Sequence, residues 1–213
     1  MIIKDKEMAT MKEQGYVRPE DDFFETPKEA TCAMLAHIKI PEDVTLWECA
    51  AGYGKISKIL EKVHNKVLST ELSKDRYGIG GVDFLLDGEK YKPEGRFWIV
   101  TNPPFKYAND FIRKAFAYGA ERVICLLRFN YCESGKVRED ILGGGHLLRV
   151  LLMKERLSMA PYGWKGKVPK ATQNHAWFVF DKNFNAPEKS EFIVCRISLK
   201  EGKAYAYLHN IPL

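Results

Sequence analysis

The sequence has no paired cysteine motif, no long hydrophobic run and no large excess of charge of one sign. Its five cysteines are scattered, without a C-x-x-C pair or histidines at ligand spacing, so we expect no disulfide framework and no metal site. Cys49 and Cys125 lie in apolar runs, which predicts small buried side chains at both positions. This use of cysteine favours a reducing compartment, and we expect a cytoplasmic protein.

Targeting and membrane signals are absent from the pattern as well. Residues 1–15 are charged throughout and lack the apolar stretch of a signal peptide, and no stretch approaches the length of a membrane span. We therefore expect no membrane partner. A hydrophobic content of 46% excludes global disorder, and the net charge of +5 permits a polyanionic partner without requiring one.

Helical and strand patterns alternate along the first two thirds of the chain. The first helix is expected to have Thr26 as its cap and Pro27 at its first helical position. After Gly145 the pattern changes to strands with no clear helix between them. The pattern predicts helices at 26–38, 54–63, 107–119 and 136–142, and strands at 44–50, 66–72, 81–85, 96–101, 122–129, 146–154, 175–181, 191–199 and 204–210.

This alternation predicts an α/β fold, with a mostly parallel central sheet, helices on both faces and antiparallel strands added at one edge. The chain of 213 residues suits one such domain. We expect residues 1–22 to form a flexible arm and residues 23–213 to form the domain, with 146–213 as its β-rich C-terminal part. Ligands of open α/β sheets bind beyond the carboxyl ends of the strands, so the residues that follow each strand are the candidates for function.

The first strand leads into a turn of small residues at the start of a helix. Ala50, Gly52 and Gly54 in this turn allow a ligand to approach the backbone closely, although a tight turn without any ligand is the alternative. A phosphate-binding P-loop is excluded, because Lys55 is followed by isoleucine and the required upstream glycine is missing. The carboxylate of Glu48 would repel a pyrophosphate and favours a ligand that carries a cation.

The next two strands add two acids. Glu71 ends the second strand nineteen residues after Gly52, the spacing of a carboxylate that accepts hydrogen bonds from a ribose, and Leu72 follows it. Asp83 can accept from an exocyclic amine, and Phe84 beside it offers a ring to a flat base. Each signal is weak alone, but in this order they describe an adenosine without phosphates and with a charged substituent. That description fits S-adenosylmethionine, with residues 48–54, 71–72 and 83–84 as the cofactor site.

The fourth strand ends in an unusually rigid unit, Asn102-Pro103-Pro104-Phe105. The two prolines fix the backbone, so its carbonyl groups can point at a ligand without partners in the sheet. The side-chain oxygen of Asn102 and the carbonyl of Pro103 can both accept from one amino group, and Phe105 offers a face on which a flat base can stack. Accepting both hydrogens of an aromatic amine favours a pyramidal nitrogen that can attack a methyl sulfonium. These four residues are the candidate catalytic residues; a rigid turn followed by a packed Phe is the structural alternative.

At these residues the sequence resembles the S-adenosylmethionine-dependent amino-methyltransferases, whose hallmark is Asp/Asn/Ser-Pro-Pro-Tyr/Phe/Trp, and in particular the compact phage- and plasmid-type DNA N6-adenine methyltransferases. The resemblance spans about residues 23–181 and implies the Rossmann-like class I methyltransferase fold. It also implies that the segment "FFETPKEAT" closes over the methionine end of the cofactor, which places Phe24, Thr26 and Pro27 at the cofactor. The family often has Asp-Pro before its glycines, whereas this chain has "ECAAGYG", in which Glu48 keeps the acid.

A nucleic acid is the expected partner, with DNA favoured over RNA. A base in a duplex has to be flipped out to reach such a site. Arg128 and Asn130 follow the fifth strand and can face the target, whereas His146 and His175 are expected to be structural. The segment 153–173 interleaves basic with aromatic side chains, which suits phosphate contact and base stacking as well as it suits a solvated hairpin. Its candidate contacts are Lys154, Arg156, Tyr162, Trp164, Lys165, Lys167 and Lys170.

The leading hypothesis is therefore methylation of adenine N6 in DNA. An adenine N6 or guanine N2 amine in RNA is the main alternative, because nothing in the sequence separates the two polymers. Cytosine N4 and the amide of a protein glutamine are further substrates for this kind of motif. A protein that binds the cofactor without turnover and a dehydrogenase are the alternatives from other classes; the intact motif at 102–105 disfavours both.

Overall fold

The computed structural model describes residues 24–133, 139–159, 171, 173–186 and 192–213. The strands in these ranges are β1 (Thr45–Glu48), β2 (Val67–Glu71), β3 (Ile79–Gly80), β4 (Phe97–Thr101), β5 (Arg122–Arg128), β6 (Leu147–Met153), β7 (His175–Asp181) and β8 (Ile193–Ile197). The α-helices are α2 (Lys28–Leu35), α3 (Ser57–Val63), α4 (Phe84–Asp87), α5 (Ala108–Ala117), α6 (Glu139–Leu142) and α7 (Leu199–Leu208). Three short 3-10 helices complete the set: η1 (Gly88–Lys90), η2 (Phe105–Tyr107) and η3 (Phe129–Cys132).

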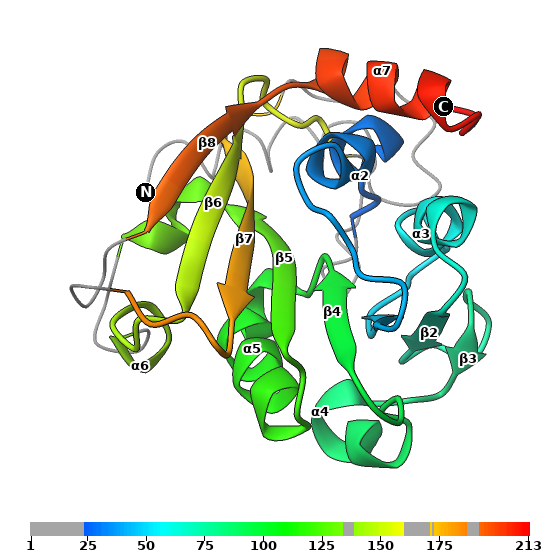
Figure 1. Ribbon diagram of the computed structural model, residues 1–213. Coiled ribbons are helices and arrows are strands. Elements are labelled where there is room, and N and C mark those ends of the chain that lie inside the picture. The colour runs from blue at the N-terminus through cyan, green and yellow to red at the C-terminus, as the bar shows by residue number, and fades with distance from the viewer. Residues whose placement is uncertain (1–23, 134–138, 160–170, 172, 187–191) are drawn as a thin grey trace, which may run out of the picture.

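These eight strands form one sheet in the order β3-β2-β1-β4-β5-β7-β6-β8 (Figure 1). Every neighbouring pair is parallel except β5–β7 and β6–β7, so β7 runs against the rest of the sheet. The expected antiparallel addition is thus β7, while β6 and β8 run in the same direction as β5. The predicted mostly parallel α/β architecture is confirmed.

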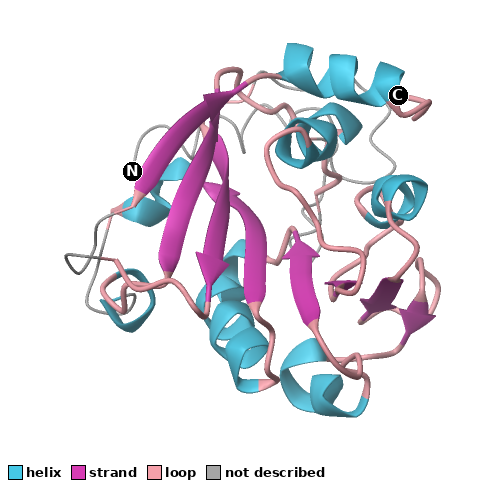
Figure 2. Ribbon diagram, viewed as in Figure 1, coloured by secondary structure: helices cyan, strands magenta, loops and turns pink. Residues whose placement is uncertain are grey.

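The sheet is covered on both faces by helices (Figure 2). Alternate residues of each strand point to opposite faces, and the core divides accordingly into two clusters. In β4, Trp98 and Val100 belong to the cluster that includes α2, α3 and α7, whereas Phe97 and Ile99 belong to the cluster that includes α4, α5 and α6. All five residues of β4 are buried, which explains its continuous apolar sequence at the centre of the sheet.

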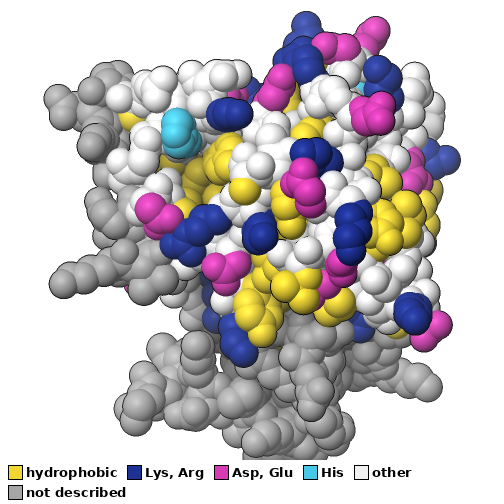
Figure 3. All heavy atoms as spheres, turned by 90° about the horizontal axis from the view of Figure 1, so that it is seen from below, with side chains coloured by type: hydrophobic (Ala, Val, Ile, Leu, Met, Phe, Trp, Pro, Cys, Tyr) yellow, Lys and Arg dark blue, Asp and Glu magenta, His cyan; other side chains and the backbone are white. Residues whose placement is uncertain are grey.

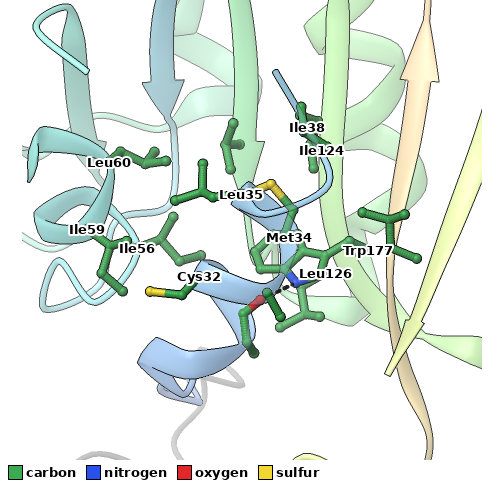
Figure 4. Close-up of a cluster of buried hydrophobic side chains, with 14 of the residues drawn as sticks. Cys32, Met34, Leu35, Ile38, Ile56, Ile59, Leu60, Ile124, Leu126 and Trp177 are labelled. Atoms are coloured by element: carbon green, nitrogen blue, oxygen red, sulfur yellow. Dashed lines mark hydrogen bonds between the residues drawn. The ribbon is translucent and has the colours of Figure 1, made fainter. Parts of the chain in front are cut away.

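Helix α2 is fixed tightly to the sheet and to α7. The indole Nε1 of Trp177 in β7 donates to the carbonyl of Ala30 over 3.0 Å, in the centre of the first cluster (Figure 4). On the other side of α2, Gly202 of α7 lies against the backbone of Glu29, where an added Cβ would be 2.0 Å from the Glu29 carbonyl oxygen. Only glycine allows the two helices to approach this closely.

Two predicted strands are wrong. Residues 81–85 do not form a strand: Asp83 caps α4 by accepting from the backbone N–H groups of Leu85 and Leu86, and the short β3 lies just before Gly81. Residues 204–210 lie in and beyond α7, which begins with a capping box formed by Ser198 and Glu201. In both places local hydrogen bonds at a helix start outweigh an apolar strand-like pattern.

The remaining predicted elements are present, the strand at 175–181 with the expected bounds and the others with shorter ones. The expected burial of Cys49 and Cys125 is confirmed, since both are at most 2% exposed. None of the helices in the described ranges is long and apolar enough to cross a membrane. The proposed arm at 1–22 lies outside the described residues.

Candidate active site

The candidate site lies along one edge of the sheet. Strands β2, β1, β4 and β5 are successive parallel neighbours, so their carboxyl ends line up. Glu71, Glu48 and Arg128 end three of these strands, and Asn102 directly follows the fourth, β4. The sheet therefore brings the residues predicted after separate strands to one edge, where the segment before α2 joins them.

The backbone of the Asn-Pro-Pro-Phe unit leaves β4 without joining another strand. The carbonyl of Pro104 accepts from the N–H of Tyr107 over 2.9 Å and so starts η2, the short helix that begins with Phe105. Among the backbone hydrogen bonds of the described residues, none ends on the carbonyl of Pro103. The rigid turn thus leaves the Pro103 oxygen available while its neighbour is occupied.

The side chain of Asn102 has a fixed orientation. Its Nδ2 donates to Thr26 Oγ1 over 3.1 Å and to the carbonyl of Phe24 over 3.4 Å. Its Oδ1 is buried and has no hydrogen-bond partner among the residues that the structure describes. A buried polar atom without a partner costs roughly 1–3 kcal/mol, and this acceptor is free to receive a hydrogen bond from a ligand.

This arrangement corrects the predicted role of Thr26 as a helix cap. Pro27 occupies the cap position of α2, and no side chain makes a capping hydrogen bond there. The Thr26 side chain is 4% exposed and is used by Asn102 instead. No sequence pattern could indicate this contact, because the two residues are 76 positions apart.

The turn of small residues after β1 is closely packed. Gly52 and Gly54 have positive φ angles of 55° and 78°, which favour glycine. A Cβ at Gly54 would lie 2.5 Å from the ring of Tyr77, so no larger residue fits without a shift. Ala50 is half-buried, and Ala51 donates its N–H to Thr70 at the end of β2. The turn is thereby held against the next strand.

Glu71 is tied directly to this turn. Its Oε2 accepts from the N–H of Gly52 over 2.7 Å, and its Oε1 accepts from the N–H of Ser73 over 3.1 Å and from Arg76 over 3.3 Å. A carboxylate has about four acceptor positions, so one remains for a further donor. Leu72, the next residue, is 62% exposed and places an apolar side chain beside this carboxylate.

Glu48 is buried at the start of α3. Its Oε2 accepts from the N–H of Ser57 over 2.6 Å and from the Ser57 hydroxyl. Burial raises the pKa of the Glu48 carboxyl well above its usual range, and the two bonds from Ser57 oppose that rise. Within the described residues Glu48 joins β1 to α3 and so fixes the turn between them.

Asp83 and Phe84 lie in different environments. Asp83 is partly exposed and uses Oδ1 to cap α4. Phe84 is 2% exposed and stacks on Phe111 with ring centroids 4.9 Å apart, so its ring is part of the core and not of the surface. Phe84 therefore anchors α4, and the second oxygen of Asp83 is the group of this pair that a ligand can reach.

Phe105 is half-buried and contacts two polar side chains. The Arg128 guanidinium carbon lies 5.0 Å from the centroid of its ring, and the His175 ring centroid lies 5.9 Å away. Burial lowers the pKa of His175 to about 4, and the charge of Arg128 adds to this effect, so the imidazole is neutral at physiological pH. Arg128 and His175 are paired residues in the β5–β7 ladder.

The predicted nucleic-acid segment is described only in part. Lys154 and Arg156 follow the carboxyl end of β6 and are exposed, and Arg156 Nε donates to Asn174, which precedes His175, over 3.4 Å. These two basic residues therefore lie on the same side of the sheet as the candidate site. The other candidate contacts lie outside the described residues: Tyr162, Trp164, Lys165, Lys167 and Lys170.

The opposite end of the molecule has mixed charges. In Figure 1 β4 points toward α2, and the view from below shows Lys and Arg side chains interspersed with Asp and Glu (Figure 3). Arg96, just before β4, pairs with both Asp43 and Glu121 over 2.6 and 2.8 Å. Charges paired in this way attract a polyanion weakly.

Comparisons with known proteins agree with this fold. No family model matches the chain, and no curated protein matches its sequence. Among solved structures, it is similar to the methyltransferase subunit of a type I restriction-modification system from Streptococcus thermophilus, with a TM-score of 0.56 and 13% identity over 75% of this chain and 45% of that one. It is also similar to the type I restriction enzyme EcoKI M protein, with a TM-score of 0.54 and 14% identity over 81% of this chain and 48% of that one. A third similar structure is the 23S rRNA methyltransferase ErmE, with a TM-score of 0.51 and 15% identity over 78% of this chain and 72% of that one.

The chain thus has the Rossmann-like fold of the class I methyltransferases, as the sequence resemblance implied. It spans about half the length of the two type I subunits. The neighbours agree with the resemblance to amino-methyltransferases inferred from the residues around Asn102, while identities this low define the fold alone.

Proposed function

We propose that this protein is an S-adenosylmethionine-dependent methyltransferase that methylates the exocyclic N6 amine of adenine in DNA, with the base flipped out of the duplex. The observation that carries the proposal is the buried, unpartnered Oδ1 of Asn102, directly after β4. Asn102 presents this oxygen in one orientation because its Nδ2 is already bound by the segment before α2. An amino group that donates to Asn102 Oδ1 and to the Pro103 carbonyl satisfies both oxygens.

The residues along the sheet edge suit the cofactor. The glycine turn with Gly52 gives close backbone approach, Glu71 keeps one acceptor position for a ribose hydroxyl, and exposed Leu72 can pack on the adenine ring. Asp83, whose Oδ1 caps α4, accepts from the exocyclic amine of that ring through its other oxygen. The carboxylate of Glu71 beside the turn suits a ligand without phosphates. When bound, the cofactor supplies an electrophilic methyl group on a sulfonium.

The chain's own residues act by positioning and electrostatics. The lone pair of an adenine amine is delocalised into the ring and is a weak nucleophile. Hydrogen bonds from both amine hydrogens, to Asn102 Oδ1 and to the Pro103 carbonyl, favour a pyramidal nitrogen whose lone pair is available. The same oxygens stabilise the positive charge on the nitrogen as it forms its new bond, before one of its protons leaves to water. Phe105 contributes a ring face for the target base.

A methyl-transfer assay tests the proposal. Purified protein is incubated with labelled S-adenosylmethionine and unmethylated DNA, and in parallel with total RNA, and the modified nucleoside is identified by mass spectrometry. We expect N6-methyl-2′-deoxyadenosine. The Asn102→Ala variant should lose turnover by at least about 100-fold, the loss typical of an essential oxyanion or amide group, while its cofactor affinity in calorimetry stays within a few-fold. Undiminished turnover in this variant would refute the mechanism.

Methylation of an amine in RNA, at adenine N6 or guanine N2, is the second candidate. It is favoured by the likeness to the 23S rRNA methyltransferase ErmE, which the chain matches over more of that protein's length than it matches the type I subunits. Label in RNA alone would support it. Binding of the cofactor without label in either polymer would instead support a protein that binds the cofactor without turnover, or one that acts on a protein amide.

A further inference from the structure

Two polar side chains beside the catalytic motif have buried atoms that no described residue satisfies. The described residues hold five buried side-chain polar atoms without a hydrogen-bond partner, and three of them are Asn102 Oδ1, Arg128 Nε and His175 Nδ1. The latter two residues contact Phe105, the last residue of the motif that begins with Asn102. This clustering at one end of the sheet is the feature that a fold-stabilising role leaves unexplained.

The sheet itself fixes where these two side chains lie. Arg128 is the last residue of β5, His175 is the first of β7, and the two are opposite each other in the antiparallel ladder. The N–H of Phe129 donates to the carbonyl of Asn174 over 2.8 Å, one step beyond this pair, and closes the ladder. The pair therefore forms a rigid wall next to Phe105, and its unpartnered atoms are not the result of a loosely placed loop.

The chemistry of the wall specifies what it can bind. Arg128 carries a permanent charge and its Nε is a donor without an acceptor, while His175, 5% exposed, is neutral. A donor in this place calls for an acceptor on the ligand. Adenine has such acceptors on both sides of its N6 amine, the ring nitrogens N1 and N7, and cytosine has one beside its N4 amine. The side-chain amide of glutamine has no ring nitrogen.

On the basis of the function proposed above, we propose that Arg128 recognises the ring edge of the target base and that His175 is a positioning residue for Arg128. Arg128 Nε donates to the ring nitrogen adjacent to the methylated amine, while the guanidinium stays stacked against Phe105. His175 lies opposite Arg128 and keeps the guanidinium in place from the neighbouring strand. Asn102 and Pro103 then hold the amine. Arg128 distinguishes a base that has a ring acceptor beside this amine from a substrate that has none.

Base analogues that lack one ring nitrogen test this directly. DNA is prepared with adenine replaced by 7-deazaadenine or by 1-deazaadenine, which exchange N7 or N1 for C–H, and single-turnover methylation is measured. The wild-type rate should fall at least 10-fold on one of the two analogues. The Arg128→Ala variant should be slower on ordinary adenine by a similar factor and should show no further loss on that same analogue. Arg113→Ala, which removes an Arg that pairs with Asp140 at the surface, is the charge-matched control and should keep the wild-type ratio.

The outcomes separate this inference from the proposed function. If the wild type methylates neither DNA nor RNA, the proposed function and the inference fall together. If it methylates adenine but the ratio of adenine to analogue rates is the same in Arg128→Ala as in the wild type, the inference alone is overturned. Arg128→Lys provides a second variant that keeps the charge without the Nε–H donor, and it should behave as Arg128→Ala does. Where RNA is the substrate, the same analogues in RNA give the same test.

Discussion

We expect the hydroxyl of Thr26 to affect kcat by orienting Asn102, without itself contacting the substrate amine or the methyl group. Thr26→Val replaces this hydroxyl by a methyl group of nearly the same shape in a site that is 4% exposed. The substitution removes the 3.1 Å hydrogen bond that orients Asn102 and leaves Nδ2 with only the longer contact to Phe24. Without that bond the amide is free to turn and to present a donor where the reaction requires an acceptor.

The size of the effect follows from the hydrogen bond that is lost. A buried neutral hydrogen bond contributes about 1 kcal/mol, and an unpaired buried donor costs roughly 1–3 kcal/mol. Because about 1.4 kcal/mol corresponds to a factor of ten in rate, we expect kcat to fall about 10-fold. Thr26→Ser keeps the hydroxyl and should stay within about twofold of the wild type.

Steady-state methylation at saturating cofactor and nucleic acid, with calorimetry of S-adenosylmethionine binding, measures this effect. A kcat loss in Thr26→Val, rescued in Thr26→Ser and with cofactor affinity unchanged, supports Thr26 as a positioning residue. Equal kcat in wild type and Thr26→Val refutes the reasoning. A loss confined to cofactor affinity would instead assign Thr26 to the cofactor, the role implied by the sequence resemblance.

Two other predictions follow from the site. Glu71→Ala should weaken S-adenosylmethionine binding at least about 10-fold, because the change removes both the free acceptor position and the hydrogen bond that holds Gly52. Calorimetry measures this affinity, and an unaltered value would mean that the ribose binds elsewhere. His175 has a folded-state pKa of about 4, below its usual 6.5, so the stability linked to its neutral form is present above pH 6.5 and is lost as pH falls toward 4, by up to about 3 kcal/mol. The thermal unfolding temperature should therefore fall more steeply between pH 7 and pH 5 in the wild type than in His175→Gln. Parallel curves of unfolding temperature against pH would contradict the lowered pKa of His175.

The sequence predicts the sheet and the edge that carries the candidate site because both depend on local patterns. Continuous apolar runs mark buried parallel strands, and the prolines after β4 mark the place where the chain leaves the sheet. The errors arise where a side chain caps a helix. The Asp83 cap and the Ser198–Glu201 capping box are also local patterns. The capping box is a recognisable signal for the start of a helix, but the aromatic pattern of 204–210 suggested a strand instead.

The contacts that define the site could not be predicted, because they depend on the folded chain. Thr26 and Asn102 meet only once α2 has docked beside β4, and Arg128 meets His175 only through the antiparallel pairing of β5 with β7. The polar atoms without partners are likewise a property of packing. A sequence pattern can indicate that Asn102 is an acceptor, but only the fold shows which of its two side-chain atoms is left free.

The close packing of Gly202 against Glu29 connects the candidate site to the C-terminal helix of the chain. Helix α7 packs against α2, and the segment directly before α2 contains Thr26, whose hydroxyl orients Asn102. Lys28, at the start of α2, also donates to the carbonyl of Pro212 over 2.8 Å. Residues 199–213 thus support the segment 24–35, which orients Asn102, so we expect a tag or fusion added after Leu213 to disturb the candidate site as directly as a substitution within that site.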